Sequence, residues 1–165
     1  MQRKPLTKEA ALTRLEALCS RSEQCESDIV RKLYNWGLSA SDRKEIIQSL
    51  RENRFVDDAR FAKSYANDKA RFSSWGPNKI KVELIKRKIN ASYIKEALSG
   101  VDRKVWNEGL LRATQSKARN IDLIGEDEWD NREKLFRYLI MRGFPSSAVS
   151  KAIDWIKKQQ LLDRE

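Results

Sequence analysis

The feature that most constrains the fold of this chain is an internal repeat. One helix–turn–helix pattern recurs twice, without a gap between its two helices. Each copy has two apolar residues four apart, an apolar residue in the turn, a serine, and two apolar residues in the returning helix. The three sets are Ile29, Leu33, Leu38, Ser41, Ile46 and Ile47; Ile80, Leu84, Ile89, Ser92, Ala97 and Leu98; and Leu135, Leu139, Phe144, Ser147, Ala152 and Ile153. Because one such unit buries little apolar surface alone, neighbouring units must stack.

Each repeat also needs a leading helix, and the apolar periodicity supplies one. We expect these helices over residues 7–20, 58–72 and 102–118. The chain has only 6 glycines and 3 prolines, and it is rich in Leu, Lys, Glu, Arg and Ala, a composition that favours helix. The sequence therefore predicts an all-α fold with nine helices in three tandem three-helix repeats, which form an elongated, curved, right-angled stack.

The repeats are expected at residues 1–57, 58–101 and 102–165. Gly37 suits the position just after a helix, where a residue in the left-handed conformation ends it. Ser39 or Ser41 is expected to cap the returning helix of the first repeat, and the other repeats carry a serine at the position of Ser41. Residues 120–129 contain Gly125 and several acidic side chains, and they are expected to form a loop.

The absence of histidine excludes several classes of active site. The chain cannot form a Ser-His-Asp triad, a Cys-His pair or an imidazole zinc site. Two cysteines cannot form a four-thiolate site, and the glycine-rich phosphate-binding motifs GxxxxGK[ST] and GxGxxG do not occur. We therefore expect no cofactor, no metal and no catalytic residue.

Cellular location is predicted from the cysteines and from the lack of long apolar stretches. Cys19 and Cys25 are interpreted as reduced thiols of a cytoplasmic protein, with a redox switch as the alternative. No apolar stretch is long enough to span a membrane, and no apolar signal segment follows the basic N-terminus. We expect no membrane partner.

Two acidic groups invite a metal or acid–base hypothesis. Asp57 and Asp58 lie directly before an amphipathic helix, where acidic residues cap helix N-termini, so we interpret them as caps. Glu126, Asp127, Glu128 and Asp130 lack the ligand alternation of a calcium loop. We interpret this second group as a solvated acidic loop.

The positive charge is concentrated in the middle repeat. The net charge is +10, from 34 basic and 24 acidic residues, and residues 58–101 hold 10 basic and 4 acidic residues, a net of +6. Lys79 and Lys86 lie on nearly the same side of one predicted helix, and Arg60 and Arg71 nearly eclipse each other on the preceding one. Such rows fit a phosphate backbone or an acidic protein groove. Trp75, beside the row, could stack on a base or be buried at a helix start.

The middle of the chain resembles the signature of the RecX family of bacterial RecA regulators. The resemblance is carried by residues 54–62 (RFVDDARFA) and 76–89 (GPNKIKVELIKRKI), with weaker support from residues 20–22, 31–33 and 142–144, and it extends over residues 8–157. It implies a nine-helix, three-repeat protein that lies in the groove of a RecA–single-stranded-DNA filament. Family members inhibit filament extension, strand exchange and co-protease activity without catalytic activity of their own.

This sequence departs from the family pattern at two places. Lys88 stands where the family usually has glycine, which adds a charge in the turn after the helix. In the first repeat, residues 25–28 lengthen the stretch between Ser22 and the Arg31-Lys32-Leu33 segment.

Three functional hypotheses follow. The first is a monomeric, non-enzymatic modulator of the RecA filament, with weak or indirect contact to single-stranded DNA without sequence specificity. The second is a stand-alone DNA-binding protein of helix-turn-helix type. The third is a nuclease built on Asp57, Asp58 or the acidic loop. The predicted filament or nucleic-acid contacts are Arg60, Arg71, Trp75, Lys79, Lys86, Arg87, Lys88, Arg132, Arg137 and Arg142.

Overall fold

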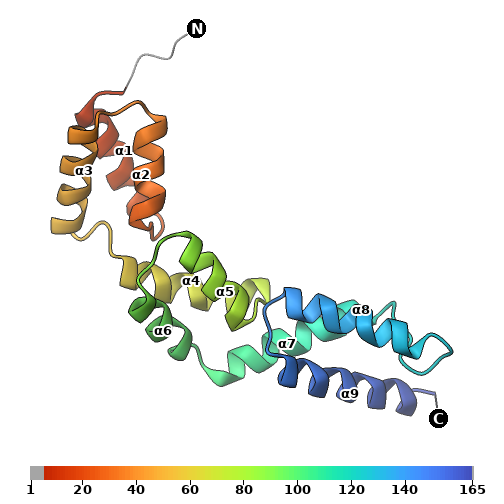
Figure 1. Cartoon of the computed structure of the whole chain (residues 1–165). Helices are drawn as coiled ribbons and strands as arrows, with labels where there is room; N and C mark the ends of the chain where they lie inside the picture. The colour runs from red at the N-terminus through yellow and green to blue at the C-terminus, as the bar shows by residue number, and fades with distance from the viewer. Residues whose placement is uncertain (1–5, 165) are drawn as a thin grey trace, which may run out of the picture. The chain divides into compact units, whose positions relative to one another are not determined.

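The regular secondary structure is entirely helical over residues 6–164, which the computed structural model describes (Figure 1). Within that range it has nine helices, as predicted. They are α1 (Lys8–Cys19), α2 (Glu26–Asn35), α3 (Ala40–Glu52), α4 (Asp58–Ser73), α5 (Pro77–Lys86), α6 (Ala91–Ser99), α7 (Arg103–Ala118), α8 (Glu128–Met141) and α9 (Ser146–Leu162). The predicted loop at residues 120–129 is shorter than expected, because α8 already begins at Glu128.

The residues of the internal repeat form the core. In each copy the two apolar residues of the first helix and the apolar residue of the turn are buried. In each returning helix one of the two predicted residues is buried and the other is half-buried. The nine positions in the first group are Ile29, Leu33, Leu38, Ile80, Leu84, Ile89, Leu135, Leu139 and Phe144. The three-helix repeat predicted from the sequence is therefore confirmed in the packing.

The same backbone turn follows the second helix of every repeat. The second residue after that helix has a positive φ, 79° at Gly37, 58° at Lys88 and 92° at Gly143. The next residue is the apolar residue of the turn, and its N–H donates to a carbonyl in the last turn of the helix. The three bonds are Leu38 N to Leu33 O (3.2 Å), Ile89 N to Leu84 O (3.1 Å) and Phe144 N to Leu139 O (3.3 Å). This pattern is a Schellman motif, which ends the helix and directs an apolar side chain into the core.

Each returning helix begins before the serine of the repeated pattern, which is Ser41, Ser92 or Ser147. Ser39, not Ser41, caps α3, since its Oγ accepts from the N–H of Asp42 at 3.1 Å. At the same position of the second repeat, Asn90 Oδ1 accepts from the N–H of Ser92 at 2.9 Å. Only one residue separates the turn residue from each returning helix, so that residue is the N-cap. Of the predicted capping serines, Ser39 is confirmed, whereas Ser41, Ser92 and Ser147 lie inside the first turns of α3, α6 and α9.

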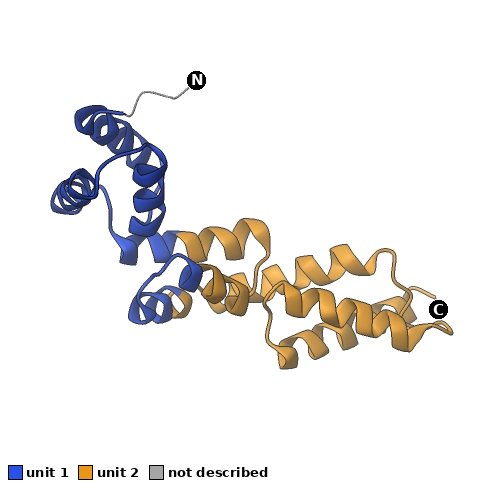
Figure 2. Cartoon of the chain, turned by 45° about the horizontal axis from the view of Figure 1, so that its top comes forward, with its two compact units in different colours: residues 1–64, 84–97 blue, residues 65–83, 98–165 orange. Residues whose placement is uncertain are grey.

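The contacts divide the chain into two compact units (Figure 2). Unit 1 contains residues 1–64 and 84–97, and unit 2 contains residues 65–83 and 98–165. In unit 1, α1, α2 and α3 pack around Leu15, Leu33 and Leu50, which are fully buried. In unit 2, α7, α8 and α9 pack around Leu135 and Ile153. Helices α4 and α5 each run from one unit into the other, so the middle repeat contributes to both.

Within unit 2, the start of α5 is bound directly to the turn that follows α8. The N–H of Gly76 donates to Arg142 O at 2.7 Å, and the N–H of Asn78 donates to Gly143 O at 3.0 Å. The first N–H groups of a helix and its last carbonyls have no partners inside the helix. Here the N–H groups at the start of α5 donate to the carbonyls at the end of α8. Pro77, between the two donors, is the first residue of α5 and has no N–H to satisfy.

Two arginines of the third repeat bind the carbonyl end of α4. Arg142 Nη2 donates to Ser73 O at 2.5 Å, and Arg112 Nη2 donates to Arg71 O at 2.7 Å. Arg112 Nε also donates to Ser74 Oγ at 3.3 Å. Cations at the end of a helix satisfy its last carbonyls and complement its dipole. The end of α4 is therefore held by residues that lie far along the chain.

The left-handed conformation of Lys88 predicts that glycine at this position stabilises the protein. A left-handed L-residue carries a steric penalty that glycine avoids, so Lys88→Gly should raise the free energy of unfolding by about 1 kcal/mol. Denaturant unfolding followed by circular dichroism measures the change. As the matched control, Lys81→Gly in the exposed interior of α5 should lower stability by a similar amount. A Lys88→Gly protein no more stable than the wild type would contradict the interpretation.

The close approach at Gly76 predicts a destabilising variant. A Cβ on Gly76 would collide with the backbone of Gly143 and with the backbone nitrogen of Phe144, neither of which can rotate away. Gly76→Ala should therefore lower the free energy of unfolding by about 2–3 kcal/mol. The control is Gly100→Ala, at an exposed position outside the left-handed region. Equal thermal unfolding midpoints for the two variants would show that the approach is not tight.

Candidate functional site

Trp75 lies at the centre of a cluster of basic and aromatic side chains in unit 2. The Nζ atoms of Lys69 and Lys79 lie 4.9 Å and 4.3 Å from the centroid of its ring. Lys69 Nζ is also 5.5 Å from the ring of Tyr65. Each ammonium is attracted to the electron-rich face of an aromatic ring, an interaction of about 0.5–1 kcal/mol at a partly exposed site. We call Tyr65, Lys69, Trp75 and Lys79 the Trp75 cluster.

The Trp75 cluster changes the interpretation of two predicted contact residues. Trp75 is half-buried, so it is neither a core residue nor a fully open platform for a base. Lys79 is held on the ring, which fixes its positive charge at a defined place beside the start of α5. Sequence reasoning missed Lys69. Its position six residues before Trp75 gave no signal, because a turn, not a helical register, brings the two together.

Three other predicted cations lie on the surface of α4 and α5 or just after them. Arg71, Lys86 and Lys88 are exposed. Within the part of the chain that the structure describes, the guanidinium of Arg71 makes no ion pair, although its backbone carbonyl is bound by Arg112. Phe72 is 83% exposed beside Arg71. The side chains of Arg71, Phe72 and Lys88 are therefore open to a partner.

The exposed side of α5 combines cations with apolar residues. Val82 and Ile85 are 49% and 54% exposed, and Lys81 and Lys86 are exposed with them. At 100° per residue these four side chains lie within about 140° of arc. We call them the α5 face. The sequence analysis missed Val82 and Ile85, although the buried positions Ile80 and Leu84 could have identified them as lying on the opposite side.

Two predicted contact residues of unit 1 are used inside the unit. Arg60 Nε donates to Glu23 Oε1 at 2.6 Å, and its Nη2 donates to Arg54 O at 3.0 Å. The hydrogen bond to Glu23 raises the pKa of the Arg60 guanidinium, which stays charged. Arg87 Nε lies 3.5 Å from Asp28 Oδ2. Both side chains bind other residues of unit 1. These bonds account for Arg60 and Arg87 without any contact to a partner.

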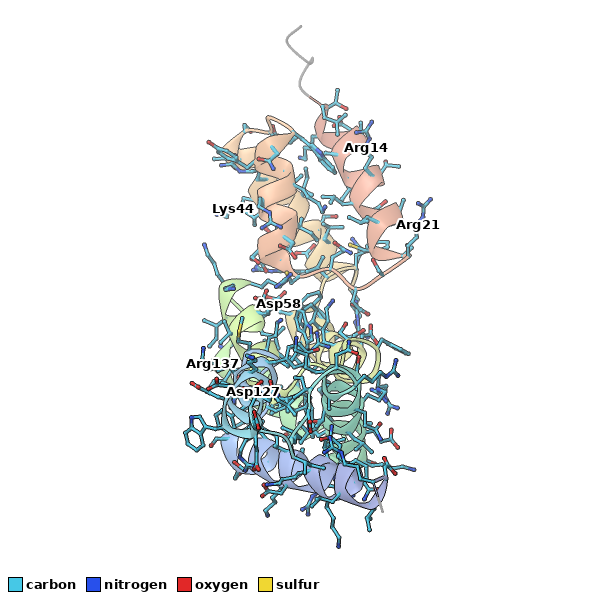
Figure 3. All side chains as sticks on the ribbon, turned by 90° about the vertical axis from the view of Figure 1, so that its right-hand side faces the viewer. Arg14, Arg21, Lys44, Asp58, Asp127 and Arg137 are labelled. Carbon is cyan, nitrogen blue, oxygen red and sulfur yellow. The ribbon has the colours of Figure 1, made fainter. Side chains whose placement is uncertain are left out.

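The three predicted cations of the third repeat are also engaged. Arg132 Nη2 lies 2.8 Å from Asp154 Oδ1, and Arg137 Nε donates to Glu133 Oε1 at 3.0 Å. Arg137, labelled in Figure 3, is nevertheless largely exposed. Arg142 binds Ser73 O, and its guanidinium lies 5.7 Å from the centroid of the Tyr138 ring. Arg142 therefore holds α4 in place and is not a free surface cation.

The paired aspartates cap two different helices, which confirms the capping interpretation. Asp57 Oδ1 accepts from the N–H of Arg60 at 2.9 Å at the start of α4. Asp58 Oδ1 accepts from the N–H of Glu26 at 2.9 Å and so caps α2, whose own N-cap residue, Cys25, makes no capping hydrogen bond with its side chain. Burial raises the pKa of Asp58 above its usual value.

Acidic side chains in and beside the acidic loop make hydrogen bonds and ion pairs within unit 2. Asp122 Oδ1 accepts from the N–H groups of Ile124 (2.9 Å) and Gly125 (3.2 Å). The hydrogen bond from Ile124 contributes most to lowering the pKa of Asp122, and Arg164 and the bond from Gly125 lower it further. Glu128 pairs with Lys157. Among the described residues, no three acidic or thiol side chains are grouped as metal ligands would be.

The two cysteines are free thiols in unit 1. Cys19 is half-buried and Cys25 is buried. Burial raises the pKa of both thiols, which lowers the fraction of reactive thiolate near neutral pH. Over residues 6–164, no helix is both long and apolar enough to cross a membrane.

The capping role of Asp58 (labelled in Figure 3) predicts how its variants behave. Asp58→Ala leaves the buried N–H of Glu26 without its acceptor and should lower the free energy of unfolding by about 1–2 kcal/mol. Asp58→Asn keeps an acceptor oxygen and should stay close to the wild type. Because the folded pKa of Asp58 is raised, the folded protein binds this proton more tightly than the unfolded chain does. The wild type should therefore lose stability relative to Asp58→Asn as the pH rises from about 4 to about 7.

Thermal unfolding of the wild type and both variants across this pH range measures the effect. Asp68→Asn, at an exposed position of α4, is the matched control and should show a smaller pH-dependent difference. If Asp58→Ala proved as stable as the wild type, the capping role would be wrong.

Comparison with known proteins places this arrangement in one family. The family model described as "RecX, second three-helix domain" matches residues 57–98, which contain α4, α5 and α6. Relatives named "Regulatory protein RecX" match most of the chain. That of Clostridium acetobutylicum is 30% identical over 145 residues, which cover 87% of this chain and 67% of the relative. That of Clostridium tetani is 32% identical over 124 residues, 75% of this chain and 56% of the relative.

Solved structures agree with the sequence comparison. A crystal structure of the regulatory protein RecX superposes with a TM-score of 0.76 at 26% identity, covering 89% of this chain and 71% of that one. RecX from Lactobacillus salivarius shares the fold, with a TM-score of 0.72 at 20% identity, covering 89% of this chain and 94% of that one. The chain spans 66% of the length of relatives such as that of Clostridium botulinum (strain Alaska E43), just under two thirds. From its sequence, its repeated turn and its fold, the chain belongs to the RecX family.

Proposed function

We propose that this chain is a non-enzymatic regulator of RecA that binds, as a monomer, in the groove of the RecA–single-stranded-DNA filament. Binding there would block filament extension and so inhibit the recombinase, ATPase and co-protease activities of RecA, which links the protein to DNA repair and the SOS response. Membership of a family of regulatory proteins supports a regulatory role. The choice of RecA as the partner rests on the family resemblance.

The α5 face is the observation that supports this proposal best. Two exposed aliphatic side chains, Val82 and Ile85, accompany the exposed cations Lys81 and Lys86 on one helix. A surface that bound only phosphates would gain little from exposed aliphatic residues. Interfaces between proteins combine an apolar centre with a polar rim. The composition of the α5 face therefore favours an acidic protein surface, such as a protein-coated DNA filament, over naked DNA.

The Trp75 cluster extends the basic surface next to the start of α5. Lys79 is fixed on the indole ring, so less side-chain entropy is lost when it binds a partner. Arg71 and Lys88 are further exposed cations that could approach the DNA within the filament. We expect these cations to contact mainly phosphates, so that direct DNA contact would be weak and independent of sequence.

Tandem repeats suit a helical polymer as the target. A filament offers the same protomer surface many times, and a chain of related units can contact several protomers. Linked weak contacts then give an affinity that one unit alone could not reach. The exposed cations of the third repeat, Arg137 above all, would add to the contacts of the middle repeat.

The test is the ATPase activity of RecA on single-stranded DNA, measured with substoichiometric amounts of this protein. The wild type should inhibit. The double variant Lys79→Glu, Lys86→Glu should need about tenfold more protein for half-inhibition, because reversed charges at an interface repel an acidic partner. The far-ultraviolet circular dichroism spectrum should stay unchanged.

Arg14→Glu, Arg21→Glu is the matched control, with the same change in net charge at exposed positions of α1 and of the turn that follows it (Figure 3). It should inhibit as the wild type does. Equal inhibition by the wild type and by the Lys79→Glu, Lys86→Glu protein would show that the assigned face is wrong. Absence of inhibition by the wild type would refute the proposed function itself.

The helix-turn-helix alternative makes a different prediction for the same protein without RecA. A stand-alone DNA-binding protein should bind duplex DNA tightly and prefer particular sequences. Titrations with random single-stranded and duplex DNA over a range of salt concentrations separate the two. A filament regulator should bind both only weakly, with an affinity that falls steeply with salt.

A further inference from the structure

Unit 1 contains a groove that plays no part in the proposed filament contacts. It lies between α2 and α3 and encloses about 370 Å³. One face of α3 forms one side of the groove, and the first turns of α2 form the other. The lining residues are Glu26, Val30, Ala40, Arg43, Lys44, Ile47, Gln48 and Arg51. From Ala40 to Arg51, this side of α3 is about 16 Å long at the rise of an α-helix, enough for about three turns of a second helix.

The floor of the groove is apolar and is left open by the core of unit 1. Ile29 and Ile46 are buried in that core. Their neighbour Ile47 also packs against this core without being fully covered by it, and Val30 lies outside the core. Val30 is 38% exposed and Ile47 is half-buried, and both line the groove. One turn beyond Val30 on α2, Tyr34 is 68% exposed and extends the apolar surface.

The rim of the groove is basic, and its charges have fixed positions. Arg51 Nε donates to Glu26 Oε2 at 2.8 Å, which neutralises the one acidic residue of the lining. Arg43 Nη1 donates to Leu38 O at 3.1 Å, and its guanidinium lies 5.4 Å from the centroid of the Tyr34 ring. Lys44 is exposed and has no ion-pair partner among the residues that the structure describes. The net charge of the lining, three cations against one carboxylate, is +2.

We propose that the groove between α2 and α3 binds an acidic segment of a partner protein, an amphipathic helix whose aliphatic or aromatic side chains enter the floor. Val30, Ile47 and Ala40 would contact its apolar face. Lys44 and Arg43 would pair with its carboxylates. Helices that lie in grooves use apolar anchors at spacings of three and four residues, and a basic rim selects acidic sequences among them.

Two other occupants fit these features less well. A nucleic-acid backbone binds along rows of available cations, whereas Lys44 is the one lining cation without an intramolecular ion pair or hydrogen bond among the described residues. An aliphatic floor also offers little to phosphates. A second copy of this chain carries a net charge of +10 and would be repelled by the first.

The probe for the test is a fluorescein-labelled synthetic peptide of three to four helical turns, with leucines on one face and glutamates on the other. Its binding to the full chain is measured by fluorescence anisotropy. Binding should be saturable. It should be lost when serines replace the leucines or when lysines replace the glutamates, because each change removes one of the two complementary features.

Lys44→Glu is the variant that tests the rim. It should weaken peptide binding about tenfold, because a repulsive charge replaces an attractive one at the groove. Arg14→Glu is the matched control, since Arg14 is exposed on α1 and does not line the groove (Figure 3). It should leave the affinity nearly unchanged.

Val30→Ser tests the floor and should weaken binding severalfold, because it removes buried apolar area from the complex. Circular dichroism of each variant establishes that the fold is intact, and the Lys44→Glu result stands without Val30→Ser should the latter unfold.

Four outcomes would overturn the proposal. The first is the absence of saturable binding, and the second is an equal loss of affinity for Arg14→Glu and Lys44→Glu. The third is displacement of the peptide by oligodeoxythymidylate. The fourth is the formation of a dimer of this chain, detected by sedimentation, that displaces the peptide. The third would assign the groove to nucleic acid and the fourth to self-association. None of these measurements contains RecA, so they fail or succeed independently of the proposed filament binding.

Discussion

A protein built from short helices must find partners for the many backbone groups that helix ends leave unpaired. Nine helices stand within residues 6–164. Neighbouring residues satisfy many of their ends, through the repeated turn and caps such as Ser39 and Asp57, and distant residues satisfy others. The carbonyl end of α8 and the N–H end of α5 pair with each other, and Asp58 caps α2 from the start of α4. The arrangement of each unit follows from where these groups find partners, as much as from the apolar core.

This requirement also explains how the basic residues are divided between internal and external roles. Arginine, with five donors in a planar fork, is well suited to bind carbonyls and carboxylates. Arg112 and Arg142 bind backbone carbonyls, and Arg60 binds both Glu23 and a carbonyl. The two cations of the α5 face are instead lysines. The net charge therefore overstates the surface available to a polyanion, because part of it is committed to holding helix ends.

The helices and the repeat could be predicted because both depend on local spacing. Buried residues recur at Ile29, Ile80 and Leu135, and the turn that follows keeps the same geometry even where Lys88 replaces glycine. Ser39, one of the two caps expected for the first repeat, does cap α3, whereas Ser92 and Ser147 do not cap their helices because the turn is shorter than the pattern suggested.

The candidate site could be predicted only in part. The charge count identified the middle repeat, and the positions of Lys79 and Lys86 on one helix followed from helical geometry. The internal role of Arg142 could not be predicted, because its partner, Ser73, is 69 residues away in the sequence. For the same reason the sequence did not reveal the groove between α2 and α3, whose lining depends on how two helices pack.

The bond between Gly76 and Arg142 has a consequence for the order in which the chain is built. During synthesis, Gly76 and Asn78 are made before residues 142 and 143 exist. Until then, the N–H groups of Gly76 and Asn78 lack these carbonyl partners, and the carbonyl end of α4 lacks Arg142. Contacts between distant residues form late, because the intervening chain must first be ordered. Completion of the second repeat therefore waits for translation of the third.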